Sequence, residues 1–232
     1  MVKTIIVILP LLLCLSITSC TFGHASTHIL FIGNSFTEFN GGIDQGIRDM
    51  ATSTATERVL VGGETLESHW NKGDALRAIR KGGWSYVVLQ EQSLWPVLAR
   101  DKFFQYVRMF DKEIRAAGGQ TVLLMTWERP DSVSNGVTTT NLAAAYNAIG
   151  AEVRAIMVPA GIAFARSRIA RPDLSLSSAD GHPTVYGTYL ATCVLYGAVF
   201  GKSPTTASHD DSRVPGDLRT YFKRIAAETL GY

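Results

Sequence analysis

The stretch HILFIGNSFTEFNGG, residues 28–42, passes from an apolar run into polar and flexible residues within three positions. The run over 28–32 is typical of a strand that is buried on both faces of a parallel sheet. Ser35 and Glu38 then stand three residues apart, which is the spacing of a capping box at a helix start. The stretch therefore predicts a strand, a turn and a helix. It leaves open whether Ser35 only caps that helix or acts as a nucleophile.

The same alternation of short apolar runs and longer amphipathic segments continues along the chain. Strands are predicted at 28–32, 58–61, 86–90, 121–126 and 156–159, and helices at 43–54, 73–81, 102–117, 142–155 and, as the last helix, 186–200. Such alternation implies crossover connections between parallel strands. We therefore predict a three-layer α/β/α sandwich of flavodoxin-like type, with a mostly parallel five-stranded sheet, as one domain over residues 26–232.

The first twenty residues have the pattern of a secretory signal. Lys3 precedes an apolar segment over 5–15, and small residues follow it. Processing has two alternatives: ITSC resembles a lipobox that would make Cys20 a lipidated first residue, and GHA offers cleavage after Ala25. Either outcome predicts an extracytoplasmic protein, whose membrane contact would be a lipid anchor at Cys20 at most.

Composition excludes several function classes. The formal net charge of +2 favours neither nucleic-acid binding nor a polybasic membrane patch. Cys193 is the single cysteine after residue 20, so an internal disulfide framework is not expected. The chain has no GxGxxG or Walker pattern after its first strand, which disfavours a flavin or nucleotide domain, and a metal site at His209 lacks ligands at suitable spacing. We expect no cofactor and no metal.

A serine needs a base to become a nucleophile at neutral pH, so a catalytic role for Ser35 requires a suitable histidine. His182 differs from the other four because it lies in SSADGHPTVYG, with Asp180 two residues before it and Pro183 after it. Proline fixes the backbone beside the imidazole. The alternative is an ordinary turn without a catalytic role, since Asp-Gly is common in turns and proline is common at the start of a helix.

Taken together, these segments resemble the SGNH, or GDSL-type, hydrolase family in the family's block order. FIGNSFT resembles the first block, with Ser35 at the nucleophile position and Asn34 in place of the commoner Asp. VGGETL resembles the second block, whose glycine donates a backbone N–H to the oxyanion. Gly63 is the residue expected in this role, and Gly62 is the neighbouring candidate. VVLQEQS takes the third place, with Gln92 where the family has an oxyanion-binding Asn. The resemblance thus implies an oxyanion hole of Ser35, Gly63 and Gln92.

DGHPTVYG resembles the last block, which supplies the acid and the base. The family places the acid three residues before the histidine, whereas Asp180 is two before His182 and Ala179 holds the third place. Two alternatives follow: a shortened turn brings Asp180 to the imidazole and completes a Ser–His–Asp triad, or His182 forms a dyad with the serine.

The resemblance implies an exported serine esterase that cleaves O-acetyl or other carboxylic esters, with a small-molecule or carbohydrate ester as substrate. Alternatives are a lysophospholipase or thioesterase of the same fold, and a binding lipoprotein that keeps the fold without activity. The sequence gives no indication of the oligomeric state.

Overall fold

The computed structural model of the protein describes residues 26–208 and 211–232. The predicted signal, with Cys20 and both processing points, lies outside these residues, and so does His209. Within the part that is described, no helix is both long and apolar enough to cross a membrane.

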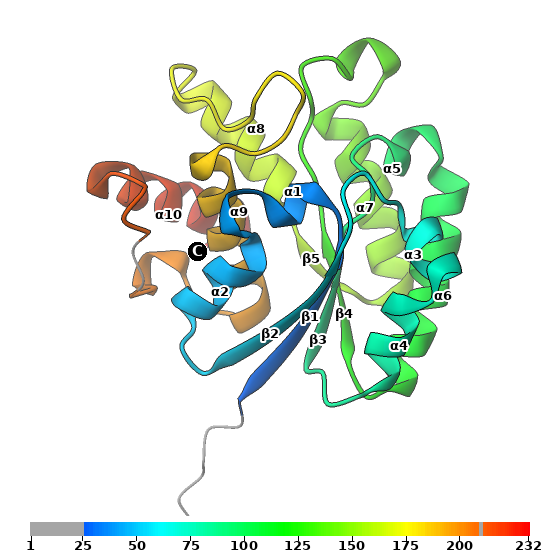
Figure 1. Ribbon diagram of the computed structural model, residues 1–232. Helices are drawn as coiled ribbons and strands as arrows, with labels where there is room; N and C mark the ends of the chain where they lie inside the picture. The colour runs from blue at the N-terminus through cyan, green and yellow to red at the C-terminus, as the bar shows by residue number, and fades with distance from the viewer. Residues whose placement is uncertain (1–25, 209–210) are drawn as a thin grey trace, which may run out of the picture.

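The centre of the molecule is a five-stranded sheet in the order β2-β1-β3-β4-β5 (Figure 1). All four neighbouring pairs are parallel, with Ile29 of β1 opposite both Thr56 of β2 and Tyr86 of β3. The strands are β1 (Thr27–Gly33), β2 (Thr54–Leu60), β3 (Tyr86–Leu89), β4 (Gln120–Leu124) and β5 (Ile156–Val158). The predicted fold class is confirmed, and the strand order is that of flavodoxin-like sheets.

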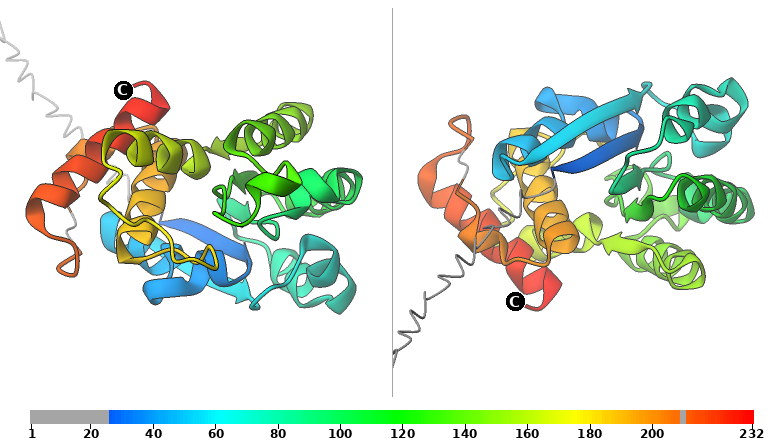
Figure 2. Two further views of the ribbon diagram at one scale, coloured as in Figure 1. Left: turned by 90° about the horizontal axis from the view of Figure 1, so that it is seen from above. Right: turned by 90° about the horizontal axis from the view of Figure 1, so that it is seen from below.

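Helices cover both faces of the sheet (Figures 1 and 2). One face carries α2 (Ile43–Met50), α8 (Ala160–Ala170), α9 (Val185–Phe200) and α10 (Gly216–Leu230), and the other carries α3 (Leu66–Lys72), α4 (Asp74–Arg80), α6 (Arg100–Ala116) and α7 (Thr139–Val153). The short elements are α1 (Ser35–Glu38), α5 (Trp95–Leu98) and the 3₁₀ turns η1 (Phe39–Gly41), η2 (Val133–Asn135) and η3 (Pro204–Thr206).

The period-two alternation of β1 divides its apolar side chains between the two layers. Ile29 and Phe31 pack into the core beneath α2 and α9, whereas Leu30 and Ile32 pack into the core beneath α3 and α6. All four are at most 1% exposed. Burial of each such side chain stabilises the fold by about 1.5–3 kcal/mol, so this strand is anchored from both sides. The serine that follows it therefore projects from a rigid edge.

Several predicted boundaries were wrong, for identifiable reasons. β2 begins four residues before the predicted 58–61, because an edge strand that is half exposed has no continuous apolar run. Helix 186–200 is correctly placed as α9 but is not the last, because α10 follows it with Leu218, Phe222 and Ile225 on its buried side. The prediction also missed α3 and α8.

Candidate active site

The candidate site lies at the carboxyl ends of β1 and β3. These two strands are neighbours in the sheet, and the strand order reverses between them. Ser35 is the first residue of α1, directly after β1. In Figure 1, α1 lies at the upper edge of the sheet, beside the connection that leads into α9. This is the position at which parallel sheets bind their ligands.

The predicted capping box at Ser35 is wrong by one residue. Asn34 is the N-cap of α1, and its Oδ1 accepts a hydrogen bond of 3.1 Å from the N–H of Phe36. Glu38 is exposed and does not reach back to cap the helix. Since Asn34 supplies the cap, the hydroxyl of Ser35 is available for another partner.

A buried glutamine that the sequence analysis missed fixes this turn. The backbone N–H of Asn34 donates to Gln90 Oε1 at 2.9 Å, and Gln90 Nε2 donates to Asn34 Oδ1 at 3.0 Å. The Thr37 hydroxyl also donates to Gln90 Oε1, at 3.0 Å. A Cβ at Gly33 would lie 2.6 Å from that oxygen, so the glycine allows the close approach. Gln90 therefore orients the residues on both sides of Ser35.

Ser35, His182 and Asp180 form one continuous hydrogen-bonded chain. The Nε2 atom of His182 lies 2.9 Å from Ser35 Oγ, and its Nδ1 lies 2.9 Å from Asp180 Oδ2. A carboxylate accepts from the Nδ1–H, which leaves Nε2 to accept the serine proton. Of the two alternatives for the last block, the shortened turn is thus the one that the geometry matches.

The two-residue spacing succeeds because of Gly181. This residue has a φ of +88°, a left-handed conformation that reverses the chain between Asp180 and His182. A Cβ at Gly181 would also lie 2.6 Å from Cγ of Arg129. The Trp127 indole donates to the Gly181 carbonyl at 2.9 Å and so stabilises this turn. The tryptophan is buried and so supports the site from within.

Asp180, the carboxylic acid of this hydrogen-bonded series, is ionised. The Ser178 hydroxyl donates to Asp180 Oδ1 at 2.5 Å, and the His182 backbone N–H donates to the same oxygen at 3.2 Å. These bonds, with that of the imidazole, hold the pKa of Asp180 well below its usual range. Asp180 is therefore charged at neutral pH and is able to stabilise an imidazolium.

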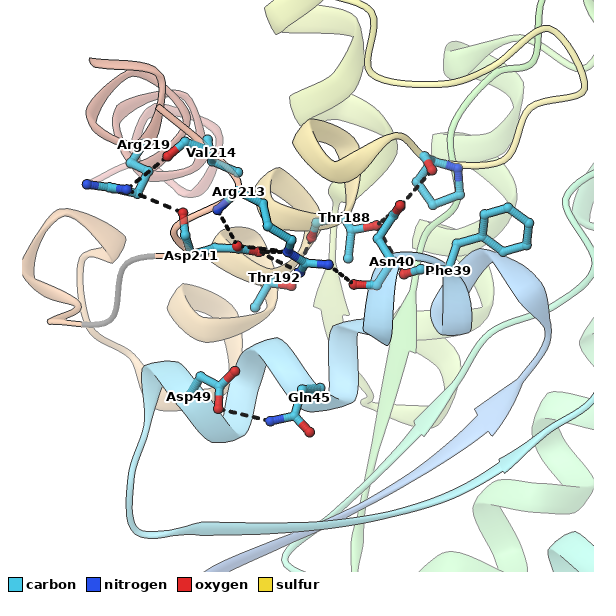
Figure 3. Close-up of polar contacts among 11 residues, drawn as sticks. Phe39, Asn40, Gln45, Asp49, Thr188, Thr192, Asp211, Arg213, Val214 and Arg219 are labelled. Carbon is cyan, nitrogen blue, oxygen red and sulfur yellow. Dashed lines mark hydrogen bonds and ion pairs between the residues drawn. The ribbon is translucent and has the colours of Figure 1, made fainter. Parts of the chain in front are cut away.

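Residues that follow α1 hold the imidazole from the opposite side. The Phe39 ring stacks on the His182 ring, with centroids 4.2 Å apart and an interplanar angle of 18°. The Asn40 side chain donates to the Pro183 carbonyl at 2.8 Å, and Arg213 donates to the Asn40 carbonyl at 2.7 Å (Figure 3). The segment before α10 is thereby connected to the histidine loop.

Two backbone N–H groups and one amide are available for an oxyanion. Ser35 N–H and Gly63 N–H have no partner among the described residues. Gly63 has a φ of +74° in a turn closed by the Glu64 N–H to the Val61 carbonyl, at 3.1 Å. Gln92 Oε1 accepts from the Leu94 N–H at 2.8 Å, which leaves its NH₂ to donate.

All five residues that the sequence predicts for the site, Ser35, Gly63, Gln92, Asp180 and His182, line one cavity of about 160 Å³. Its lining consists of Asn34, Ser35, Phe36, Gly63, Gln92, Ser93, Arg129, Asp180 and His182. Gly62, the alternative oxyanion donor, is not part of it. Within residues 26–208 and 211–232, His, Cys, Asp and Glu form no group of three that would suit a metal ion.

No family model matches the chain, and a search of curated proteins finds no match either. Solved structures do match. A candidate SGNH hydrolase from Slackia heliotrinireducens is 26% identical, with 75% of this chain and 99% of that chain covered and a TM-score of 0.67.

This match supports the assignment of the chain to the SGNH hydrolase family. Two further structures share its fold at lower identity. A DUF4886 family protein from Bacteroides uniformis is 15% identical, with a TM-score of 0.74 over 89% of this chain and 95% of that chain. A variant of an acetyl-xylooligosaccharide esterase from Geobacillus is 14% identical, with a TM-score of 0.59 over 75% of this chain and 94% of the esterase.

Proposed function

We propose that this SGNH protein is a serine esterase with Ser35 as nucleophile, His182 as general base and Asp180 as the acid that orients the base. The observation that carries the proposal is the unbroken chain from Ser35 Oγ through the imidazole to the Asp180 carboxylate, with 2.9 Å at each contact. Nucleophile, base and orienting acid in hydrogen-bond contact are what acyl transfer through serine requires.

In this mechanism Ser35 Oγ attacks the ester carbonyl carbon while its proton passes to His182 Nε2. Asp180 accepts the Nδ1–H and stabilises the imidazolium that forms. The imidazolium then gives its proton to the departing alcohol, which leaves an acyl group on Ser35. A water molecule, deprotonated by the same imidazole, attacks the acyl carbonyl and releases the acid.

The oxyanion of each tetrahedral intermediate would bind to the N–H groups of Ser35 and Gly63 and to the amide of Gln92. The absence of other partners for the two N–H groups among the described residues supports this role, because preorganised donors cost no reorganisation during the reaction. Ser35 also begins a helix, and the N–H groups at a helix start favour negative charge close to them.

We propose a short acyl group, acetyl in particular, on a carbohydrate. A cavity of about 160 Å³ is small beside the 300–1,000 Å³ that drug-sized ligands occupy, which favours a small acyl group over the chain of a lysophospholipid or a long thioester. The polar side chains of Asn34, Gln92 and Ser93 in its lining suit a hydroxylated alcohol. The acetyl-xylooligosaccharide esterase with the same fold is consistent with this substrate class.

We propose further that the enzyme acts outside the cytoplasm, with residues 26–232 as its SGNH domain and with membrane contact only through a lipid on Cys20. The signal pattern of the first twenty residues supports this location. Incorporation of labelled palmitate by the wild type, and its loss in Cys20→Ser, is the expected result in a bacterial host. Equal labelling of both chains would contradict the anchor.

The experiment for the main proposal is hydrolysis of p-nitrophenyl acetate by wild type, Ser35→Ala and His182→Ala. Each substitution should lower kcat by about 10³-fold or more, because nucleophile and base act as a unit. Ser203→Ala and His28→Ala, which change the same residue types far from the cavity, are the matched controls and should keep wild-type rates. A folded wild type without activity would instead favour a binding protein.

Substrate class is tested by acetate release from acetylated xylooligosaccharides and by comparison of p-nitrophenyl acetate with the octanoate. The small cavity predicts a higher kcat/KM for acetate. A preference for octanoate would contradict the proposed acyl group and would favour the lysophospholipase or thioesterase alternative.

A further inference from the structure

Two loops carry the oxyanion donors that the proposed function requires besides the nucleophile itself. Residues 61–65, between β2 and α3, carry Gly63, and residues 90–94, between β3 and α5, carry Gln92. An oxyanion hole works only when its donors lie about 2.7–3.1 Å from the developing charge. The two loops therefore have to be held in a fixed relation to each other.

One buried carboxyl group connects these loops. Glu91 Oε1 accepts a hydrogen bond of 2.7 Å from the N–H of Gln92 and one of 3.1 Å from the N–H of Leu66. Leu66 is the first residue of α3, three positions after Gly63. A single oxygen atom thus bonds to the backbone on both sides of the oxyanion hole.

Capping of α3 does not explain this contact. The Thr65 hydroxyl already accepts from the Ser68 N–H at 3.1 Å and serves as the N-cap. Glu91 is an additional acceptor at the same helix start. Its second bond, to Gln92, lies outside α3 altogether.

Packing does not explain a carboxyl group here either. Glu91 is 1% exposed and forms no ion pair among the described residues, and its Oε2 has no hydrogen-bond partner among them. Burial raises the pKa of Glu91 to about 7, although the N–H groups of Gln92 and Leu66 lower it. An unpaired buried carboxyl is costly, and an apolar side chain would fill the same space without that cost.

We propose that Glu91 is a positioning residue of the oxyanion hole, which holds the Gly63 and Gln92 loops in register through the two N–H bonds to its Oε1. This inference rests on the proposed esterase function. It assigns to Glu91 no contact with the substrate; the side chain acts through the backbone of the residues that make that contact.

Glu91→Gln and Glu91→Leu form a matched pair for the test. The two side chains are similar in size, but only the amide oxygen of glutamine is able to accept both N–H bonds. With p-nitrophenyl acetate, Glu91→Leu should lower kcat by about tenfold to 100-fold, less than deletion of a whole donor, with KM changed by no more than about threefold. Glu91→Gln should keep kcat within about threefold of wild type. Equal kcat values for the two variants would overturn the proposal.

A double-mutant cycle with Gln92→Ala separates positioning from a loss of packing. If Glu91 acts through the donor loops, Gln92→Ala should lower kcat by a smaller factor in the Glu91→Leu background than in wild type. Fully independent effects would overturn the proposal. Ser167→Ala, which changes a buried side chain of α8 whose hydroxyl pairs with Tyr221 and with neither loop, is the control and should keep the wild-type kcat.

If Glu91→Leu does not fold, Glu91→Asp replaces it, because the shorter side chain withdraws the carboxylate from the two N–H groups. A kcat at least about fivefold below wild type supports the proposal, and a wild-type kcat overturns it. Failure of the esterase function would look different: wild type itself would be inert and unlabelled by a fluorophosphonate probe, and the role of Glu91 would fall with it. An active wild type that needs Ser35 but not Glu91 overturns the positioning role alone.

Discussion

Glu91→Gln should remove a pH dependence of stability that wild type has. Burial is the main cause that raises the pKa of Glu91 from 4.5 to about 7, and the charge of Glu67 adds to it. The folded protein therefore binds this proton more tightly than the unfolded chain does. The contribution to stability is fully present below pH 4.5 and is lost as the pH rises through 7.

The expected magnitude follows from the two pKa values. A difference of one pH unit corresponds to about 1.4 kcal/mol, so the interval from 4.5 to about 7 corresponds to a loss of about 3 kcal/mol of unfolding free energy. Glutamine has no charge at any of these pH values. The difference in unfolding free energy between Glu91→Gln and wild type should therefore shift by about 3 kcal/mol in favour of the variant between pH 4.5 and pH 8.

Urea unfolding of both proteins at a series of pH values measures this difference directly. The comparison between the two proteins cancels other groups that titrate in the same range, such as His69, whose burial lowers its pKa and costs stability at acid pH. Glu38→Gln, which makes the same exchange at an exposed position, is the control for the substitution itself. A difference between Glu91→Gln and wild type that stays constant from pH 4.5 to 8 would refute the reasoning.

Three further predictions concern the loop that carries the base. Gly181→Ala should lower kcat at least about tenfold and destabilise the fold by about 1 kcal/mol or more, because a Cβ is strained at a φ of +88° and meets Arg129; unchanged kinetics and urea unfolding would contradict this. Asn40→Ala should lower kcat several-fold at unchanged KM, since Pro183 loses its bond, and Asn40→Asp should not restore it, because a carboxylate has no N–H to donate. Asp180→Asn should lower kcat by about 10²-fold or more with p-nitrophenyl acetate; a loss of less than about threefold would indicate a Ser–His dyad.

Sequence patterns sufficed for the sheet and for the order of the site segments, because both depend on local periodicity. The buried run over 28–32 and its counterparts predicted β1 and β3 to within a residue or so. Patterns failed where burial is uneven. The exposed edge strand β2 lacks a continuous apolar run. The helix α10 is a different case, because its apolar residues do recur at helical spacing although no helix was predicted there.

At the site itself, residue identity was predictable and tertiary contact was not. Asn34 and Ser35 are both good N-cap residues, and only the bond from Gln90 to Asn34 determines which of them caps α1. The spacing of Asp180 and His182 gave no answer about a triad, because the answer depends on the backbone conformation of Gly181. The sequence also does not indicate whether a glutamine or glutamate at a strand end, such as Gln90 or Glu91, is exposed or buried.

The central claim is that Ser35 is a nucleophile activated by His182. Treatment with a fluorophosphonate probe, followed by intact mass measurement and peptide mapping, tests it most directly. We predict one adduct per chain on the peptide that contains Ser35, no adduct in Ser35→Ala, and labelling at least about 10²-fold slower in His182→Ala. A folded wild type without an adduct, or with its adduct on another serine, would contradict the account.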